Sequence, residues 1–258
     1  MADVRTRQIV QAEALCRWNH PEHGPIPPDE FIAIAEQMGM INQISDFVLS
    51  QSCRAAAHWR DVGLHINVAV NVSGRELLDG LLVERVMGQL REHDLPPEFL
   101  TLEVTETEAM ADPIQAARIL DELARQGVSI AIDDYGTGHS ALSYIHSLPA
   151  KKLKIDRSFV TNLQNEGSNR VIVQATIDMA HRLGLTVVAE GAEDDITCAL
   201  LAEAGCDLIQ GYYLSKPISA EDLEAWLLGG ARLEYTPLTS AKSAAGRTHV
   251  PAGFRTPV

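Results

Sequence analysis

The sequence has few cysteines, and their spacing is not that of a metal site. It contains four cysteines among 258 residues, and none of them stands in a C-x-x-C pair. Isolated cysteines of this kind are typical of small hydrophobic core residues in a reducing compartment. We expect that role for all four of them: Cys16, Cys53, Cys198 and Cys206.

Positive charge and long apolar runs are also scarce. Lysine and arginine number 21 against 35 acidic residues, which gives a formal net charge of −14. Proteins that bind DNA or RNA carry basic patches, so this balance disfavours that class, and an anionic substrate would need bridging cations. The apolar runs are short and broken by charge, and no signal peptide opens the chain. We therefore expect no nucleic-acid partner, no membrane span and a cytoplasmic location.

The sequence does contain a regular alternation of short apolar runs and longer amphipathic stretches. The runs are rich in Val, Ile and Leu, which is typical of strands buried on both faces. They are QAEALCRW, HINVAVNVS, LTLEVTE, VSIAIDD, KLKID, TVVAEG and DLIQG. The stretches between them have helical spacing and include residues 28–37, 41–62, 76–93, 113–126, 169–183 and 194–204.

Strands and helices that alternate in this way form βαβ units around a parallel sheet. Seven strands without an intervening linker favour a TIM-like (β/α)8 barrel over an open sheet. Residues 1–6 are polar and short, so we expect the first strand to be missing or truncated. We assign residues 1–228 to this domain. Residues 229–258 are rich in Gly, Ser, Thr, Ala and Pro, and we expect them to form a flexible C-terminal tail.

Nearly every predicted strand ends in a side chain that can bind a hard cation. These side chains are Glu13, Asn71, Glu103, Asp133, Asp134, Asp156, Glu190 and Gln210, with Lys154 two residues before Asp156. In a parallel barrel the carboxyl ends of all strands meet on one face. Five carboxylates crowded there repel one another, and one lysine cannot offset them, so the pattern predicts bound divalent metal. Carboxylate and amide oxygens suit Mg²⁺ or Mn²⁺ rather than Zn²⁺.

Two local patterns bear on this site. His20 and His23 lie in the segment NHPEHG, which is more typical of a surface loop than of a pair of metal ligands. Asp133 and Asp134 are neighbours in one strand, and neighbours face opposite sides of a sheet. Both can reach one site only where the strand breaks into a loop, and the nearby Gly136 and Gly138 favour such a break.

The same glycines also fit the G-x-G-x-x-G/A fingerprint of a dinucleotide-binding turn, and Asp156 follows Gly136 by 20 residues. That fingerprint belongs to the first βα unit of a domain, whereas this turn lies well inside the chain. Asp133 and Asp134 would also repel a pyrophosphate bound next to them. We therefore favour the metal site over a dinucleotide site.

Taken together, seven ordered motifs resemble the EAL domain family of cyclic di-GMP phosphodiesterases, over about residues 3–228. The motifs are AEALCRW (12–18), NVS (71–73), LEVTET (102–107), DDYGTGHSAL (133–142), LKID (153–156), AEGAE (189–193) and QGYYLSKP (210–217). The resemblance implies hydrolysis of cyclic di-GMP to linear pGpG by water that two Mg²⁺ or Mn²⁺ ions activate.

The resemblance also implies roles for particular residues. One ion would be held by Glu13, Asn71, Glu103 and Asp133, and the second by Asp133, Asp134 and Glu190. The implied catalytic residues are Glu13, Glu190 and Lys154, of which Lys154 positions the attacking water or helps to deprotonate it. The implied substrate-binding residues are Leu15, Arg17, Asp156, Glu193 and Gln210, with Arg17 on a phosphate.

Regulation and partners follow from the same resemblance. Glu106 would anchor the loop after Asp134 and couple it to the interface of a homodimer. Sensor or diguanylate cyclase domains are expected in a longer parent chain. The sequence departs from the family at His139, where a tyrosine is usual, and in lacking the antiparallel first strand with its Gln-Pro pair.

Three functions are therefore compatible with the sequence. The first is the phosphodiesterase. The second is a catalytically impaired EAL domain that acts as a receptor for cyclic di-GMP. The third is a scaffolding partner that binds no nucleotide. The complete set of carboxylates and Lys154 favours the enzyme, because a scaffold does not need them.

Overall fold

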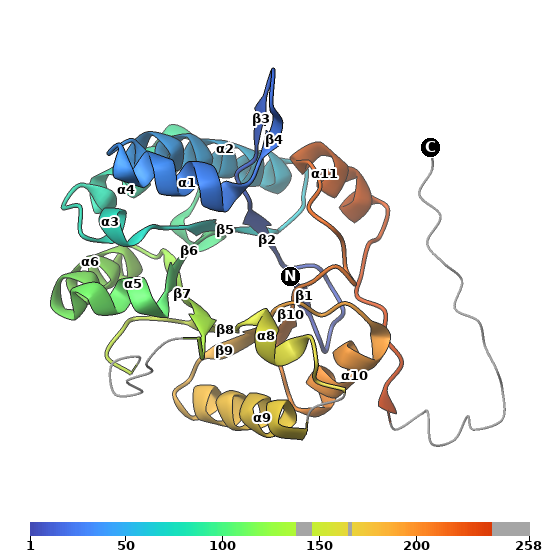
Figure 1. Cartoon of the computed structure of the whole chain (residues 1–258). Coiled ribbons are helices and arrows are strands. Elements are labelled where there is room, and N and C mark those ends of the chain that lie inside the picture. The colour runs from blue at the N-terminus through green and yellow to red at the C-terminus, as the bar shows by residue number, and fades with distance from the viewer. Residues whose placement is uncertain (138–145, 165–166, 239–258) are drawn as a thin grey trace.

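The computed structural model describes residues 1–137, 146–164 and 167–238 (Figure 1). Its main sheet has eight strands in the order β1-β10-β9-β8-β7-β6-β5-β2. Seven of them run parallel: β2 (Gln11–Ala14), β5 (Asn67–Asn71), β6 (Leu100–Thr105), β7 (Ser129–Tyr135), β8 (Lys152–Ile155), β9 (Thr186–Ala189) and β10 (Leu208–Ile209). These are the seven strands that the apolar runs predict.

Helices surround this sheet, as Figure 1 shows. They are α1 (Pro28–Gln37), α2 (Ile41–Asp61), α3 (Gly74–Leu77), α4 (Leu82–Glu92), α5 (Glu106–Ala111), α6 (Pro113–Arg125), α8 (Arg157–Val160), α9 (Gly167–Arg182), α10 (Asp195–Glu203) and α11 (Ala220–Leu228), with the 3₁₀ turn η1 (Pro97–Phe99). Helix α6 illustrates how the core forms. It buries Ala116, Ile119, Leu120 and Leu123, which share one helical face. The prediction of a TIM-like (β/α)8 barrel is confirmed.

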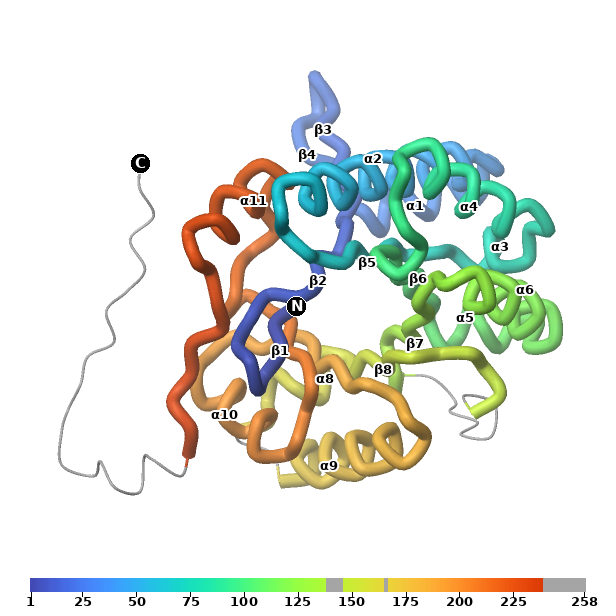
Figure 2. Tube along the Cα trace, turned by 180° about the vertical axis from the view of Figure 1, so that it is seen from behind, coloured from blue at the N-terminus to red at the C-terminus, as the bar shows by residue number. Residues whose placement is uncertain are grey.

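The first strand is short but present. β1 (Ala2–Asp3) pairs antiparallel with β10, and Ala2 also forms a bridge to Ile9, just before β2. In Figure 2 this dark blue segment lies between β2 and the orange part of the chain. Of the two expected alternatives, the strand is therefore truncated and not missing, and Met1, Ala2 and Val4 are buried. This antiparallel strand lies between β10 and the start of β2 and nearly closes the barrel.

Residues after Leu228 also contact the barrel. Leu233 is fully buried, Arg232 forms a bridge to Gln8, and the Tyr235 hydroxyl donates to the carbonyl oxygen of Val4 at 3.3 Å. Residues 232–235 therefore pack on the N-terminal segment of the barrel. The rest of the expected tail, residues 239–258, lies outside the described residues.

Several local elements differ from the expectations. The segment around His20 is the hairpin of β3 (Trp18–His20) and β4 (Gly24–Ile26), and the rings of His20 and His23 stack with centroids 4.6 Å apart. The helix expected over 76–93 is divided into α3 and α4, and between them the Asp79 carboxylate accepts from the backbone N–H of Leu81. Short polar turns of this kind interrupt a helix without changing its apolar spacing, so periodicity misses them.

The cysteines largely behave as expected. Cys53, Cys198 and Cys206 are buried, Cys16 is half-buried, and all four are free thiols. Within the described part of the chain, no helix is both long and apolar enough to cross a membrane.

Candidate active site

The strands bring the predicted polar residues to the carboxyl end of the barrel. Glu13, Asn71 and Glu103 lie on β2, β5 and β6, and the strand register places Asn71 opposite Glu103. Asp133 lies on β7, and Lys154 on β8. Glu190 and Gln210 directly follow β9 and β10. Segments nearly 200 residues apart in the sequence therefore meet, as the hydrogen bond from Gln210 to Glu13 shows.

Lys154 lies at the centre of this group and is 1 % exposed. Its Nζ atom is 2.8 Å from Glu103 Oε2, 2.8 Å from Asp133 Oδ2 and 2.7 Å from Glu190 Oε1. Glu13 Oε2 lies farther away, at 3.9 Å. Burial alone would lower the pKa of Lys154, but the surrounding carboxylates raise it well above its usual value.

Glu13 is held by two amides in addition to this lysine. Asn71 Nδ2 donates to Glu13 Oε1 at 2.9 Å, and Gln210 Nε2 donates to Glu13 Oε2 at 2.5 Å. Burial would raise the pKa of Glu13, but Lys154 and these two hydrogen bonds together hold it below its usual value. The neighbours of Glu13 therefore favour its ionised form.

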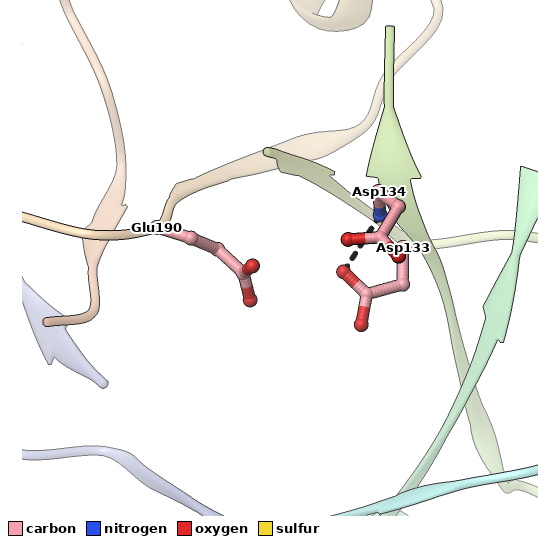
Figure 3. A group of neighbouring side chains, drawn as sticks. All are labelled: Asp133, Asp134 and Glu190. Atoms are coloured by element: carbon pink, nitrogen blue, oxygen red, sulfur yellow. Dashed lines mark hydrogen bonds between the residues drawn. The ribbon is translucent and has the colours of Figure 1, made fainter. Parts of the chain in front are cut away.

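Asp133, Asp134 and Glu190 form a second cluster at the same mouth (Figure 3). Each offers an oxygen within 4.8 Å of the others. The two neighbouring aspartates face one site because the β7–β8 register shifts between Ile132 and Tyr135, and Asp134 has a φ of 53°. The Asp134 N–H donates to Asp133 Oδ1 at 2.8 Å. Strand β7 continues to Tyr135, so this irregularity lies within the strand and before Gly136, where the break is expected.

Gly136 allows the chain to leave the strand after these aspartates. Its φ is 101°, and a Cβ atom at this position would lie 2.7 Å from a ring carbon of Phe159. Only glycine combines this backbone conformation with such a close approach. Gly138 is the second glycine of the expected break. It lies outside the described residues, together with residues 139–141 of the dinucleotide fingerprint.

For Glu103, Glu190 and Asp134, the surroundings disfavour the ionised form of the carboxyl group when no metal is bound. Burial, together with Glu13 and Asp133, raises the pKa of Glu103 to about 8 despite the nearby lysine. Burial and the same acidic neighbours raise the pKa of Glu190 to about 7. Burial, Asp133 and Asp156 also raise the pKa of Asp134. The group has more negative charge than Lys154 balances.

This donor set fits hard divalent cations. It consists of carboxylate and amide oxygens, which Mg²⁺ and Mn²⁺ prefer. Glu103 Oε1 is buried and has no hydrogen-bond partner among the described residues, although buried carboxylate oxygens are normally satisfied. A cation would supply the missing partner and offset the excess negative charge.

The expected substrate-binding residues are distributed around the mouth. Leu15 and Arg17 line a pocket of about 820 Å³ together with Glu13 and Gln210, and Arg17 is exposed. Asp156 caps α8 and accepts hydrogen bonds from Ser158. These residues surround the carboxylates, but Asp156 already has a local structural partner.

The two remaining expected residues are Glu193 and Glu106. Glu193 is exposed and lines a separate pocket beside Asp194 and Asp195. Glu106 is buried as the first residue of α5. The loop that Glu106 is expected to anchor includes His139, which lies outside the described residues.

Sequence reasoning missed the side chains that support this site from the adjacent turns. Ser73 with Glu76 and Thr105 with Glu108 form capping boxes at the starts of α3 and α5. The spacing S-x-x-E and T-x-x-E directly after a strand is a recognisable signal for such a cap. Each box follows a strand that carries a candidate ligand.

A barrel with an acidic cluster around one buried lysine at its mouth defines a candidate metal site. Comparison with known proteins identifies the family of this chain. Residues 1–217 match the EAL domain family, and the chain belongs to it. Its relatives include cyclic di-GMP phosphodiesterases, so the resemblance found in the sequence is confirmed.

Two relatives from Pseudomonas aeruginosa illustrate the similarity. The bifunctional diguanylate cyclase/cyclic di-GMP phosphodiesterase MucR is 42% identical over 218 residues, which cover 84% of this chain and 32% of MucR. The cyclic di-GMP phosphodiesterase NbdA is 42% identical over 226 residues, covering 85% of this chain and 28% of NbdA. The chain thus spans about a third of the length of these relatives.

Solved structures agree with this assignment. The MucR phosphodiesterase in complex with cyclic di-GMP superimposes with a TM-score of 0.80 at 42% identity, covering 83% of this chain and 87% of that one. The FimX EAL domain from Pseudomonas aeruginosa bound to cyclic di-GMP has a TM-score of 0.77 at 28% identity, covering 84% and 87%.

Proposed function

We propose that this chain hydrolyses cyclic di-GMP to linear pGpG and that the reaction depends on two Mg²⁺ or Mn²⁺ ions. The observation that carries the proposal is the cluster of five carboxylates around a single buried lysine at the carboxyl end of the barrel. Membership of a family that includes cyclic di-GMP phosphodiesterases gives the substrate class.

The chain offers two overlapping sets of ligands for the ions. The first set is Glu13, Asn71, Glu103 and Asp133, and the second is Asp133, Asp134 and Glu190. When bound, such ions lower the pKa of a water molecule and stabilise the charge that develops on a phosphoryl group. Asp133 belongs to both sets. Its Oδ2 atom contacts Lys154, which also contacts Glu103 of the first set, and its Oδ1 atom accepts from the backbone N–H of Asp134 of the second set.

Lys154 has the role of positioning the attacking water or helping to deprotonate it. Its ammonium group has three N–H donors, and it contacts Glu103, Asp133 and Glu190 at 2.7–2.8 Å. These contacts place the ammonium group among the proposed metal ligands, and the raised pKa of Lys154 keeps it protonated, which supports positioning of the water over direct acceptance of its proton. Glu13 and Glu190 complete the proposed catalytic set, and Gln210 orients Glu13.

The substrate would lie across the same mouth. Arg17 is exposed in the pocket beside Glu13, and its planar guanidinium suits a phosphate of cyclic di-GMP. Leu15 supplies an exposed apolar wall next to it. Asp156, Glu193 and Gln210 are proposed as further contacts at the edge.

The setting of this domain is also part of the proposal. We expect a cytoplasmic homodimer in which Glu106 couples the loop after Asp134 to the interface. Because the chain spans about a third of its curated relatives, sensor or diguanylate cyclase domains are proposed partners in a longer parent protein.

The test is to incubate the purified chain with cyclic di-GMP and Mn²⁺ or Mg²⁺ and to separate the products by chromatography. The proposal predicts pGpG that is not formed when EDTA is present. Tight binding of cyclic di-GMP without product would favour a receptor instead. The receptor is the second candidate because the first strand, β1, is only two residues long. The pocket of about 820 Å³ lies next to this strand and to Glu13, so the truncation bears on the proposed substrate site. Neither product nor binding would contradict both functions.

A further inference from the structure

Glu108 connects two loops that carry proposed metal ligands. It lies in the first turn of α5, directly after the strand that carries Glu103. Its Oε2 atom accepts hydrogen bonds from the backbone N–H of Thr105 at 3.2 Å and from the Thr105 hydroxyl at 2.7 Å. These contacts form half of the capping box at the start of α5.

The other oxygen of the same carboxylate reaches the neighbouring loop. Glu108 Oε1 accepts from the backbone N–H of Gly74 at 2.9 Å. Gly74 is the first residue of α3 and follows Asn71 by three residues. A Cβ atom at Gly74 would lie 3.1 Å from Glu108 Cγ, so the two loops meet closely at this point.

This contact continues the connection between the two strands. The backbone N–H of Val72 donates to the carbonyl oxygen of Glu103 at 2.9 Å. Beyond it the two segments turn into separate helices, α3 and α5. The Glu108 carboxylate then joins them, and a carboxylate is suited to this because it can accept at both oxygens.

The neighbouring capping box provides a matched comparison. Glu76 has the same position in the box that starts α3, where it accepts from Ser73. Its further partners are Ser45 on α2, at 2.7 Å, and Arg85 on α4, at 3.0 Å. Glu76 therefore ties α3 to the outer helices, whereas Glu108 ties it to the next ligand-bearing loop.

We propose that Glu108 is a positioning residue that fixes Asn71 relative to Glu103 for metal binding. The inference rests on the proposed function, since it takes these two residues as ligands. Groups that orient metal ligands from behind commonly change metal affinity by 10–100-fold when they are replaced. Glutamine at position 108 has one acceptor oxygen in place of two, so it cannot serve both loops.

The experiment measures the Mn²⁺ dissociation constant of the full chain by titration calorimetry, for the wild type and three variants. We expect Glu108→Gln to raise it by about tenfold. We expect Gly74→Ala to raise the Mn²⁺ dissociation constant by less than tenfold, because the added Cβ atom displaces the Glu108 carboxylate without removing it. Turnover of Glu108→Gln should recover as Mn²⁺ is raised, while the melting temperature of the metal-free variant stays above the assay temperature, which separates weaker metal binding from a destabilised fold.

Glu76→Gln is the matched control. It should lower the melting temperature and leave the Mn²⁺ dissociation constant within about twofold of the wild type. An unchanged constant in Glu108→Gln would overturn the inference, and so would an equal increase in Glu76→Gln. A wild type that binds no Mn²⁺ would overturn the proposed function itself together with this inference.

Discussion

Two polar layers lie inside the barrel, and they are built from the same three strands. Along β2, β6 and β8, residues two positions apart point to the same side of the sheet. The lower layer consists of Gln11, Thr101 and Lys152, and the upper layer, nearer the carboxyl ends of the strands, consists of Glu13, Glu103 and Lys154. Both layers place a lysine in a largely buried position.

The layers differ in the balance of charge. In the lower layer, Lys152 donates to the Gln11 side chain and, at 3.3 Å, to the Thr101 hydroxyl, both of which are neutral. Burial lowers the pKa of Lys152 to about 8. In the upper layer, Asp133, Asp134 and Glu190 add to the acids around Lys154. A buried polar layer is thus not in itself a candidate metal site. The unbalanced negative charge of the upper layer distinguishes it from the lower layer.

The largest expected effect comes from removing an upper-layer ligand. Glu13→Ala should reduce turnover of cyclic di-GMP at least about 1,000-fold, because stabilisation of transition-state charge by a metal amounts to several kcal/mol. The metal-free fold should survive, since the change removes one of several repelling acids. Turnover is measured by chromatography and folding by circular dichroism.

The control for Glu13→Ala is a substitution in the lower layer, on the same strand. Gln11→Ala should lower the melting temperature and keep turnover within about threefold of the wild type, because the Gln11 side chain is buried as a partner of Lys152 in the lower layer. Wild-type turnover in Glu13→Ala would contradict the assignment of Glu13 as a ligand.

A second comparison removes the central cation. Lys154→Met should lower the free energy of unfolding by about 3–5 kcal/mol, because it leaves buried carboxylates without their partner. It should also abolish turnover. Urea unfolding in EDTA measures the stability. A loss below about 1 kcal/mol would show that Lys154 does not balance the acids as its contacts suggest.

The charge imbalance also predicts a pH dependence. The pKa values of Glu103 and Glu190 are raised to about 8 and about 7, so both groups bind more protons in the folded state between pH 5 and 8. The buried N-terminus, whose pKa is lowered to about 5, binds fewer protons in the folded state over the same range. The two carboxyl groups outweigh the N-terminus, so the free energy of unfolding of the metal-free protein should fall as pH rises from 5 to 8, by roughly 2 kcal/mol in net. Glu103→Gln should flatten this slope, and saturating Mn²⁺ should reduce it. Stability that rises over this range would contradict the electrostatic account.

The smallest effect is expected in the lower layer. Lys152→Met should change the free energy of unfolding by about 1 kcal/mol, since Lys152 has neutral partners and a pKa already lowered by burial. Turnover should stay within about threefold of the wild type. If Lys152→Met instead matched Lys154→Met in both measurements, the distinction between the layers would fail.

Much of this organisation is readable from the sequence. The apolar runs predict all seven parallel strands, and the polar residues that end them predict which side chains meet at one face. Residues 1–6 were harder to interpret, because Asp3, Arg5 and Thr6 make the segment look polar. Asp3 is engaged in the turn, where its carboxylate accepts from Arg5 and Thr6 backbone N–H groups.

Contacts between separate loops could not be predicted in this way. The spacing of Thr105 and Glu108 indicates a helix cap, but nothing local indicates that the second oxygen of Glu108 reaches Gly74. Likewise, the position of Glu193 in the AEGAE motif does not reveal that it lines a pocket with Asp194 and Asp195 and not the pocket beside Glu13. Such contacts depend on how neighbouring βα turns pack, which periodicity does not encode.

The central claim is that divalent cations balance the acids of the upper layer. Titration calorimetry of Mn²⁺ into the metal-free chain at pH 7, in buffers of different ionisation enthalpy, tests it most directly. The account predicts two ions per chain and a release of protons, because Glu103 and Glu190 are partly protonated before the ions bind. Glu13→Ala should weaken this binding. The absence of Mn²⁺ binding to the wild type, or binding that Glu13→Ala leaves unchanged, would contradict the account.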